Sequence, residues 1–134
     1  MSLADLSVEN TIVVITGVGV LDDWGRTDPP FTIENIDDVA NLSRGLGGNA
    51  VRFHRKNPGL RLTVNFMPGS PQALAMQAQV TARAEISGSY ASISGLEGGV
   101  FSEGVITRGK SMARGGPGMN DATFVMEFNK GAIV

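Results

Sequence analysis

The chain has 134 residues, no cysteine and a hydrophobic fraction of 42%, values that fit one folded domain and exclude disulfides, thiolate metal sites and cysteine nucleophiles. The net charge is only −2, but residues 1–40 carry eight acids against one base, and residues 41–134 carry ten bases against five acids. The two parts either neutralise each other within one molecule or form surfaces of opposite sign that meet between identical copies. The sequence shows no signal-peptide pattern and no run of about 18 apolar residues, so we expect cytoplasmic synthesis and no membrane anchor.

The first third of the chain predicts a flexible arm followed by strands. Residues 1–10 are polar and lack periodicity, and we expect a flexible N-terminal arm ahead of a single domain at residues 11–134. The β-branched run at residues 11–21 favours one strand covered on both faces. A loop closed by two prolines follows, and residues 31–36 alternate as a half-buried strand.

The middle of the chain predicts a β-hairpin. Residues 51–54 and 60–66 each alternate apolar with polar side chains, and a proline–glycine pair between them suits a type II turn. We therefore expect these two stretches to pair with each other. In the first stretch, Val51 and Phe53 are expected to face the core.

One helix is predicted, at about residues 71–84. Ser70 supplies an N-cap hydroxyl, and Pro71 fits the first helical position, where the missing N–H costs nothing. The segment is rich in alanine and glutamine, which form helices readily. Four side chains are available for burial against a sheet: Leu74, Met76, Ala78 and Val80.

The last third of the chain predicts strands again. They lie at residues 90–96, 100–107 and 122–128, with a loop at residues 109–120 and a tail after residue 128. The order is strands, one helix, then strands, without the regular alternation of a parallel α/β sheet. The sequence therefore predicts a mainly β fold, an antiparallel β-sandwich or barrel with one packed α-helix and extended loops.

One stretch matches a phosphate-binding loop by its letters. Residues 104–111 (GVITRGKS) fit the pattern G-x-x-x-x-G-K-[ST]. The residues inside the pattern are β-branched, and the glycine-rich sequence after Ser111 does not support the helix whose N-terminus would face the phosphates. We expect the β-branched residues inside the pattern to continue a strand, and we predict no nucleotide site.

The remaining titratable residues do not predict an enzyme. His54 is the only histidine and lies between Arg52 and Arg55, without an acid nearby to orient it. The adjacent acids at residues 22–23 and 37–38 lack the spacing of a calcium loop. The basic residues of segment 52–61 lack interleaved aromatic platforms for nucleic acid. We therefore expect no enzymatic activity, no cofactor and no metal.

Four segments together carry a resemblance to a known family. They are FTIE at residues 31–34 with GLGGN at 45–49, LRLTVNF at 60–66, PGSPQ at 68–72 with its helix, and GGPGMN at 115–120 ahead of the strand at 122–128. In type and spacing, they resemble the tail tube proteins of contractile-tailed bacteriophages, especially the Mu-like group, and related phage-derived tubes. The basic residues 54–59 and the long loop at 22–30 depart from that pattern.

The resemblance implies an assembly. Hexameric rings, whose β-sheets join into a continuous inner barrel, would stack into a hollow tube that conducts DNA inside a contractile sheath. The implied location is the virion, after synthesis in the host cytoplasm. The implied partners are further copies of the chain and the sheath, baseplate or tube-initiator, tape-measure and tail-terminator proteins.

Charge and poor intrinsic order suggest which residues make the contacts. We expect the arm and the basic segment to lie between rings, through Asp5, Glu9, Arg52, His54, Arg55, Lys56 and Asn57. We expect a net acidic lumen, which lets DNA slide, with Glu34, Asp37 and Asp38 as candidates.

Two alternatives stay open. One is a monomeric soluble β-barrel module that binds a small ligand, with Trp24 and Tyr90 as ring platforms. The other is the tube subunit of a bacteriocin or type VI-like apparatus, which would have the same architecture without packaged DNA.

Overall fold

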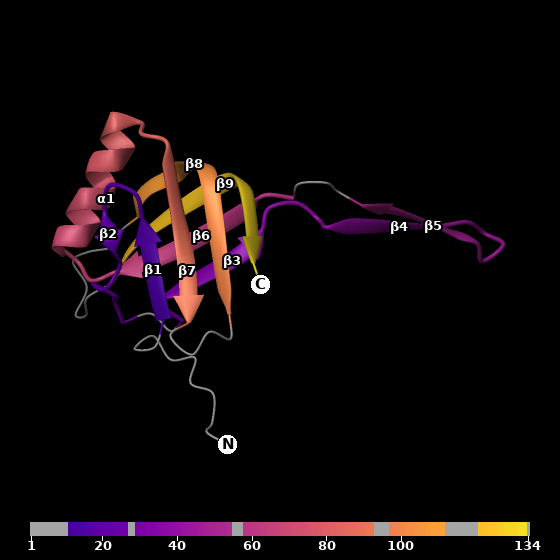
Figure 1. The fold of residues 1–134 in the computed structure, drawn as a ribbon, viewed down its shortest axis with the longest axis horizontal. Coiled ribbons are helices and arrows are strands. Elements are labelled where there is room, and N and C mark those ends of the chain that lie inside the picture. Colours follow the sequence, from indigo (N-terminus) through magenta and orange to yellow (C-terminus); the bar gives the residue numbers. More distant parts are fainter. Residues whose placement is uncertain (1–10, 27–28, 55–57, 93–96, 112–120, 134) are drawn as a thin grey trace, which may run out of the picture.

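The computed structural model describes residues 11–26, 29–54, 58–92, 97–111 and 121–133 (Figure 1). Within these residues the chain forms nine strands and one helix: β1 (Thr11–Ile15), β2 (Gly19–Val20), β3 (Phe31–Asn35), β4 (Ala40–Arg44), β5 (Ala50–His54), β6 (Leu60–Phe66), α1 (Pro71–Ala82), β7 (Ile86–Ser92), β8 (Gly98–Ser111) and β9 (Ala122–Ile133).

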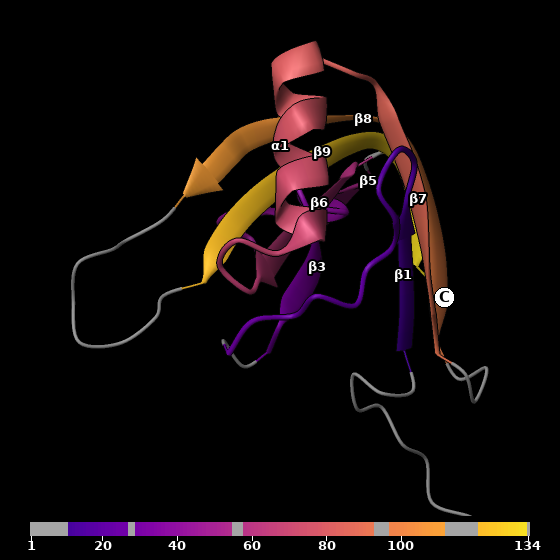
Figure 2. The same ribbon diagram turned by 90° about the vertical axis from the view of Figure 1, so that its left-hand side faces the viewer.

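Seven strands form one antiparallel sheet in the order β2-β1-β7-β8-β9-β6-β3, and β4 and β5 form a separate two-stranded sheet. The large sheet bends so that β1 and β7 face β3 and β6 across the core, and α1 lies across one open side (Figures 1 and 2). The predicted class, mainly β and antiparallel with one packed helix, is confirmed.

The core is built from the inward side chains of neighbouring strands. Alternate residues of β6 and β9 are buried, and the residues between them face outward. Phe66 lies edge-on to Phe124, with ring centroids 5.9 Å apart, and Phe101 lies against Phe128 at 4.6 Å. Full burial of side chains of this size contributes about 1.5–3 kcal/mol each.

The helix begins as predicted. The Ser70 hydroxyl accepts a hydrogen bond from the backbone N–H of Ala73 at 3.3 Å, and Pro71 occupies the first turn. The predicted buried face is only partly right, because Ala73 and Met76 are the buried residues and Leu74 is 60% exposed. The sheet covers only the side of α1 that carries Ala73 and Met76, so Leu74 faces outward.

The predicted hairpin between residues 51–54 and 60–66 is wrong in its pairing. Both stretches are strands, but β5 pairs with β4, whereas β6 lies between β3 and β9. The preceding glycine-rich segment forms the turn instead, where Gly45 N–H donates to the Asn49 carbonyl at 2.7 Å and Gly48 has φ +86°. Val51 and Phe53 therefore lie outside the core.

Three further boundaries differ from the prediction. Residues 11–21 form two strands, because Gly17 and Gly19 adopt φ values of +87° and +94° and reverse the chain between β1 and β2. The last strand extends to Ile133, and residues 109–111 belong to β8. The expected arm at residues 1–10 lies outside the described residues.

Gly104 makes a tight contact that yields a stability prediction. A Cβ added there would lie 2.2 Å from Cδ1 of Phe128, whose ring packs on Phe101. We expect Gly104→Ala to lower the free energy of unfolding by about 1–3 kcal/mol, because overpacking forces neighbouring side chains to move. Denaturant unfolding measures the effect.

Gly47→Ala is the matched control, because a Cβ at Gly47 meets nothing within 4 Å. Its stability should stay within about 0.5 kcal/mol of the unmodified chain. An equal loss in both variants would show that the Phe128 contact is not the cause.

Candidate assembly surfaces

Strands β4 and β5 form a two-stranded ribbon, here called the hairpin, that projects from the body along the long axis of the molecule (Figure 1). Every residue of both strands is exposed. An isolated two-stranded ribbon is marginally stable in water, since it has no layer to pack against. A further surface that covers the hairpin would therefore add to its stability.

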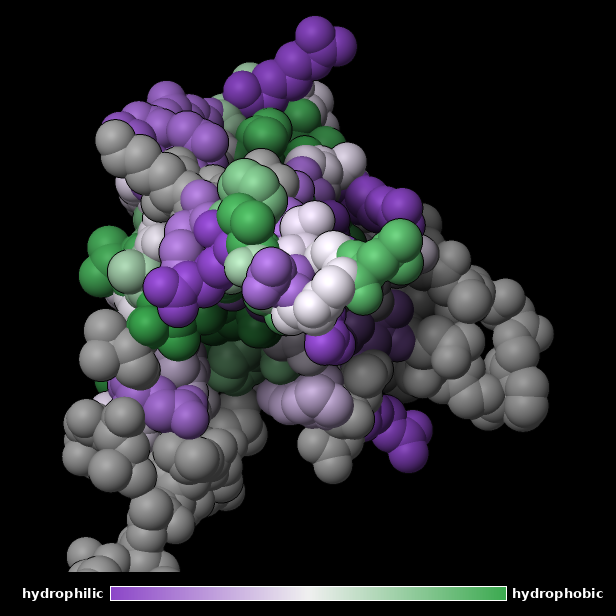
Figure 3. Space-filling view, turned by 90° about the vertical axis from the view of Figure 1, so that its right-hand side faces the viewer, coloured by the Kyte–Doolittle hydropathy of each residue, from purple (hydrophilic) through white to green (hydrophobic). Residues whose placement is uncertain are grey.

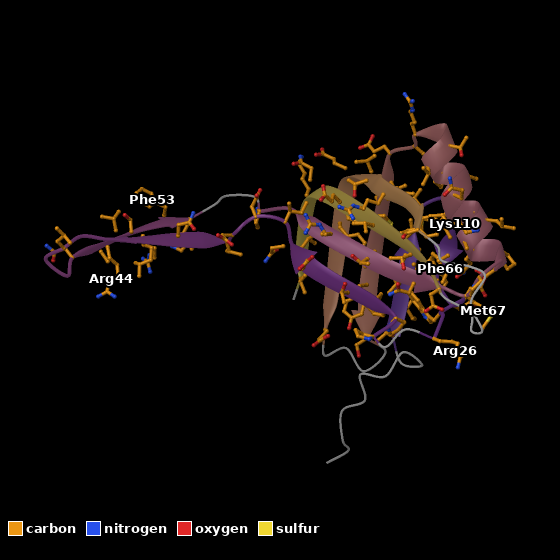
Figure 4. The ribbon with its side chains drawn as sticks, turned by 180° about the vertical axis from the view of Figure 1, so that it is seen from behind. Arg26, Arg44, Phe53, Phe66, Met67 and Lys110 are labelled. Carbon is orange, nitrogen blue, oxygen red and sulfur yellow. The ribbon has the colours of Figure 1, made fainter. Side chains whose placement is uncertain are left out.

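The two sides of the hairpin differ in chemistry. Register places Val51 opposite Ser43 and Phe53 opposite Asn41 on one side, and directly opposed residues share a face. The other side carries Arg44, Arg52, His54 and Leu42. Phe53 and Arg44 project to opposite sides of the ribbon (Figure 4).

Large apolar side chains on the hairpin are open to solvent. Val51 is 56% exposed, Phe53 58% and Leu42 66%. A view from the hairpin end shows hydrophobic side chains exposed among hydrophilic ones (Figure 3). Exposed apolar side chains that gather on one projecting element indicate a contact surface.

The structure describes two of the seven predicted inter-ring residues. Arg52 and His54 both lie on the exposed hairpin, on the same side. The predicted contacts Asp5, Glu9, Arg55, Lys56 and Asn57 lie outside the described residues. Sequence reasoning missed the apolar side of the hairpin, because alternation in β5 was interpreted as packing against the core.

A second surface covers the outward side of β3, β6, β9 and the C-terminal half of β8, and is here called the polar face. It consists of Thr32, Glu34, Arg61, Thr63, Asn65, Val105, Thr107, Arg108, Thr123, Val125 and Glu127. Eight of these eleven side chains end in charged or hydroxyl groups, as expected for the wet side of an antiparallel sheet.

Ion pairs tie the strands of this face together. Arg61 lies between two acids, with Nη2 3.0 Å from Glu127 Oε1 and Nη1 3.3 Å from Glu34 Oε1. The hydrogen bond to Glu127, and then that to Glu34, raise the pKa of the Arg61 guanidinium. Three neighbouring strands are thus linked through one cation.

A second pair lies beside the polar face. Lys130 Nζ is 3.2 Å from Glu103 Oε1, and the Asn129 amide donates to Glu103 Oε2 at 2.9 Å. The Asn129 hydrogen bond, followed by that of Lys130, lowers the pKa of the Glu103 carboxyl. Glu34, Glu103 and Glu127 on this side of the sheet therefore each have a basic partner within the same chain.

The three predicted lumen residues do not share one surface. Glu34 lies on the polar face, in the pair with Arg61. Asp37 and Asp38 lie in the connection between β3 and β4, at the root of the hairpin. Among these candidates, the structure therefore places only Glu34 on the polar face.

The strands that carry the polar face end in two open edges. At one end of β3 the Asn65 N–H donates to the Pro30 carbonyl, and at the other end the Ile36 N–H donates to the Gly59 carbonyl. Along an antiparallel strand, the backbone N–H and C=O groups of successive residues point alternately toward and away from the paired strand. The backbone groups of Phe31, Ile33 and Asn35 therefore point away from β6, toward an edge where no strand of the described residues pairs with β3.

The other open edge belongs to β8. Strand β7 pairs with β8 only as far as Gly104, whereas β9 continues to Ser111. Residues 105–111 of β8 thus have a strand on one side only, and α1 covers part of the other side, where Gln77 Oε1 accepts the Lys110 N–H at 3.2 Å.

The two aromatic residues considered as ligand platforms are used in packing. Trp24 stacks on Phe31 and Phe66, with ring centroids 5.2 and 5.9 Å apart. Tyr90 is buried, and its hydroxyl donates to Glu97 Oε2 at 2.9 Å. A hollow of about 220 Å³ lies beside Tyr90, between β3 and the end of β9, which is smaller than the ~300–1,000 Å³ of most ligand sites.

In the part of the chain that it describes, the structure gives no support to the nucleotide-site and metal-site motifs considered in the sequence. Residues 104–111, which match the phosphate-loop pattern, lie within β8, so the prediction that the β-branched residues inside the pattern continue a strand is confirmed. No group of three or more histidine, aspartate or glutamate side chains in the described ranges is arranged to hold a metal. Among the same residues, no helix has the length and apolarity to span a membrane.

Comparison with solved structures identifies the fold. A chain of the PVC sheath/tube terminator, from an extracellular contractile injection system, has a TM-score of 0.57 at 13% identity, over 100% of this chain and 99% of that one. The chain has the fold found in contractile injection systems. No protein-family model and no curated protein matches the sequence.

Two further structures agree. The anti-feeding prophage tube terminating cap has a TM-score of 0.55 at 15% identity, over 100% of this chain and 93% of that one. The PVC sheath–tube complex gives 0.54 at 12%, over 97% and 91%. The fold implied by the resemblance to tail tube proteins is thus confirmed. At sequence identities this low, the structural similarity shows the fold alone.

Tyr90 predicts a pH dependence of stability. Burial, and then the hydrogen bond to Glu97, raise the Tyr90 pKa above its ordinary value of 10.0. The folded state therefore favours the neutral phenol, and this stabilisation is fully present below pH 10.0 and lost as pH rises through the raised pKa.

Denaturant unfolding above pH ~10 should show a steeper loss of stability in the unmodified chain than in Tyr90→Phe. The chain has one tyrosine, so tyrosinate absorbance reports on Tyr90 alone. Titration at the ordinary value in the folded protein would contradict the prediction.

Proposed function

We propose that the chain is a structural subunit of the tube of a phage tail, which assembles into stacked hexameric rings inside a contractile sheath. The observation that carries the proposal is a polar, ion-paired sheet face that ends in two open strand edges. An open edge presents unpaired N–H and C=O groups and invites pairing with another chain. The shared fold with tube-associated structures supports the same function.

The strand directions allow the rings to close. The polar face has four strands, β8, β9, β6 and β3, and each pair of neighbours is antiparallel. Because four is an even number, β3 of one copy can pair antiparallel with residues 105–111 of β8 in the next copy. Repetition of this joint gives a closed barrel, in which the open edge of β3 and that of residues 105–111 of β8 are both paired.

In this arrangement the polar face lines the lumen. Its charged side chains and the adjacent pair comprise three acids and three bases: Glu34, Glu103, Glu127, Arg61, Arg108 and Lys130. A balanced wall with internal ion pairs releases few counterions from DNA, so DNA would slide without being held. This proposed wall differs from the net acidic lumen expected from the sequence, which stays a prediction.

The hairpin and the N-terminal arm would connect successive rings. The hairpin projects from the body and exposes apolar and cationic sides, as a contact between copies requires. In the proposed particle the outer surface meets the sheath, and the end rings meet baseplate, tape-measure and terminator proteins. The role is structural, without a catalytic step or cofactor.

A second candidate of the same class is the tube of an injection apparatus that carries no DNA. The specific observation in its favour is that the similar structures come from the anti-feeding prophage and from an extracellular contractile injection system. The ring and stacking surfaces are the same in both cases. Purified particles distinguish the two through the presence or absence of packaged DNA.

Ring closure through β3 can be tested with a proline. The Asn35 side chain is exposed and its N–H points to the open edge, so Asn35→Pro leaves the β3–β6 hydrogen bonds in place. It removes a donor from the proposed joint and obstructs strand pairing. We expect a folded monomer that fails to form rings in analytical ultracentrifugation and negative-stain micrographs.

Asn35→Thr is the control, because threonine keeps the N–H and suits a strand. It should form rings as the unmodified chain does. Rings of normal yield from Asn35→Pro would rule out pairing at this part of β3, and a monomeric unmodified chain at all concentrations would rule out the tube.

A further inference from the structure

The hairpin has a chemically complementary surface at the opposite end of the same molecule. The hairpin extends from one end of the long axis, and α1 and β2 lie at the other (Figure 1). In Figure 4 Met67 lies at the end away from Phe53 and Arg44. The two surfaces cannot meet within one chain.

Three exposed apolar side chains gather at this second end. Val20 is 53% exposed, Met67 48% and Leu74 60%. They lie around Gln72, in the first turn of α1, whose side-chain amide donates to the Val20 carbonyl. Two backbone hydrogen bonds connect Met67 to Leu74. The Ser70 N–H donates to the Met67 carbonyl, and the Leu74 N–H donates to the Ser70 carbonyl.

Two acids border this apolar group. The Gln72 Oε1 accepts the N–H groups of Asp22 at 2.8 Å and Asp23 at 3.0 Å, which fixes both residues beside the helix. The Asp23 carboxylate in turn accepts the Gln72 N–H at 3.2 Å. The surface formed by Val20, Asp22, Asp23, Met67 and Leu74 is here called the α1 pole.

The charges of the two surfaces are opposite. Residues 40–56, which include the hairpin, contain four bases and no acid. The five residues that form the α1 pole include two acids, Asp22 and Asp23, and no base. Nearby, the backbone N–H of Arg26 donates to the Asp121 carboxylate at 3.0 Å. The pole itself is therefore acidic as well as apolar.

We propose that the hairpin of one copy docks on the α1 pole of a second copy. The apolar side of the hairpin, with Val51 and Phe53, would cover Val20, Met67 and Leu74. Arg44 and Arg52 on the other side would lie within the field of Asp22 and Asp23. This assignment rests on the proposed tube function and adds the receiving surface for the hairpin.

A second copy is the occupant that best fits the molecule. Each chain carries both the projecting surface and the receiving one, at opposite ends. Such a head-to-tail contact leaves an unused hairpin at one end and an unused pole at the other, so it repeats without closing. It therefore generates an axial stack and does not end at a dimer.

Cysteine cross-linking tests the contact. The chain has no cysteine of its own, so Phe53→Cys/Met67→Cys introduces one thiol on each surface. Because the two residues lie at opposite ends of the chain, a disulfide between them must join different copies. We expect mild oxidation of assembled protein to give a ladder at multiples of 14.0 kDa on non-reducing gels.

Phe53→Cys/Val100→Cys is the matched control, because Val100 is exposed at 68% on β8, away from the α1 pole. A ladder with Met67→Cys and little with Val100→Cys supports the docking. Tubes seen in micrographs together with no ladder from Met67→Cys would overturn the docking and leave the tube proposal standing. An unmodified chain that never assembles would overturn both.

A charge exchange gives a second readout. Arg52→Glu or Asp22→Arg alone should shorten tubes at least severalfold at low salt, because each replaces an attraction between opposite charges across the contact with a repulsion. The combination Arg52→Glu/Asp22→Arg should restore much of the length. Equal shortening in the double variant would show that these two charges do not interact across the contact.

Discussion

The pairing of β6 with β9 is the constraint on which the rest of the structure depends. These strands pair over seven successive residues, from Leu60 opposite Phe128 to Phe66 opposite Ala122. Since side chains alternate across a sheet, this single register sends the aromatic and most aliphatic side chains of the paired residues into the core, and the polar side chains, together with Val125, to the other side. A slip by one residue would exchange the two faces. The core and the polar face are therefore two consequences of one register.

The sequence predicted these strands well because their pattern is set by burial. Alternation in residues 60–66 gave the inward and outward faces correctly, residues 122–128 were correctly predicted as a strand, and Ser70-Pro71 gave the helix start to the residue. Pairing was less predictable, because a proline–glycine pair suggests a tight hairpin between any two strands that flank it. The contact between β6 and β9 joins residues about 60 positions apart in sequence, and no local pattern specifies such a partner.

The hairpin shows a different limit. Alternation in β5 is genuine, but it predicts a half-buried strand only if some layer covers its apolar side. Among the described residues none does, so Val51 and Phe53 are exposed at more than half of their surface. The same pattern that predicts a core contact within one chain is explained, in the proposed assembly, by a contact between copies. The uneven charge of the sequence suggested such contacts, and the hairpin, which carries Arg44 and Arg52, lies at the end opposite α1, where Asp22 and Asp23 are bound to Gln72.

Two kinds of unsatisfied surface on one chain argue for a subunit that repeats in the middle of a tube. Among the described residues, the open edges of β3 and β8 lack a neighbouring strand, and they run in directions that would allow a ring to close. The hairpin and the α1 pole carry exposed apolar side chains at opposite ends of the chain, so in the proposed tube they would act along the axis. A terminator needs only one axial surface, since nothing stacks beyond it. A chain with both axial surfaces, complementary in charge and in apolar exposure, has the requirements of a subunit with an identical neighbour on each side.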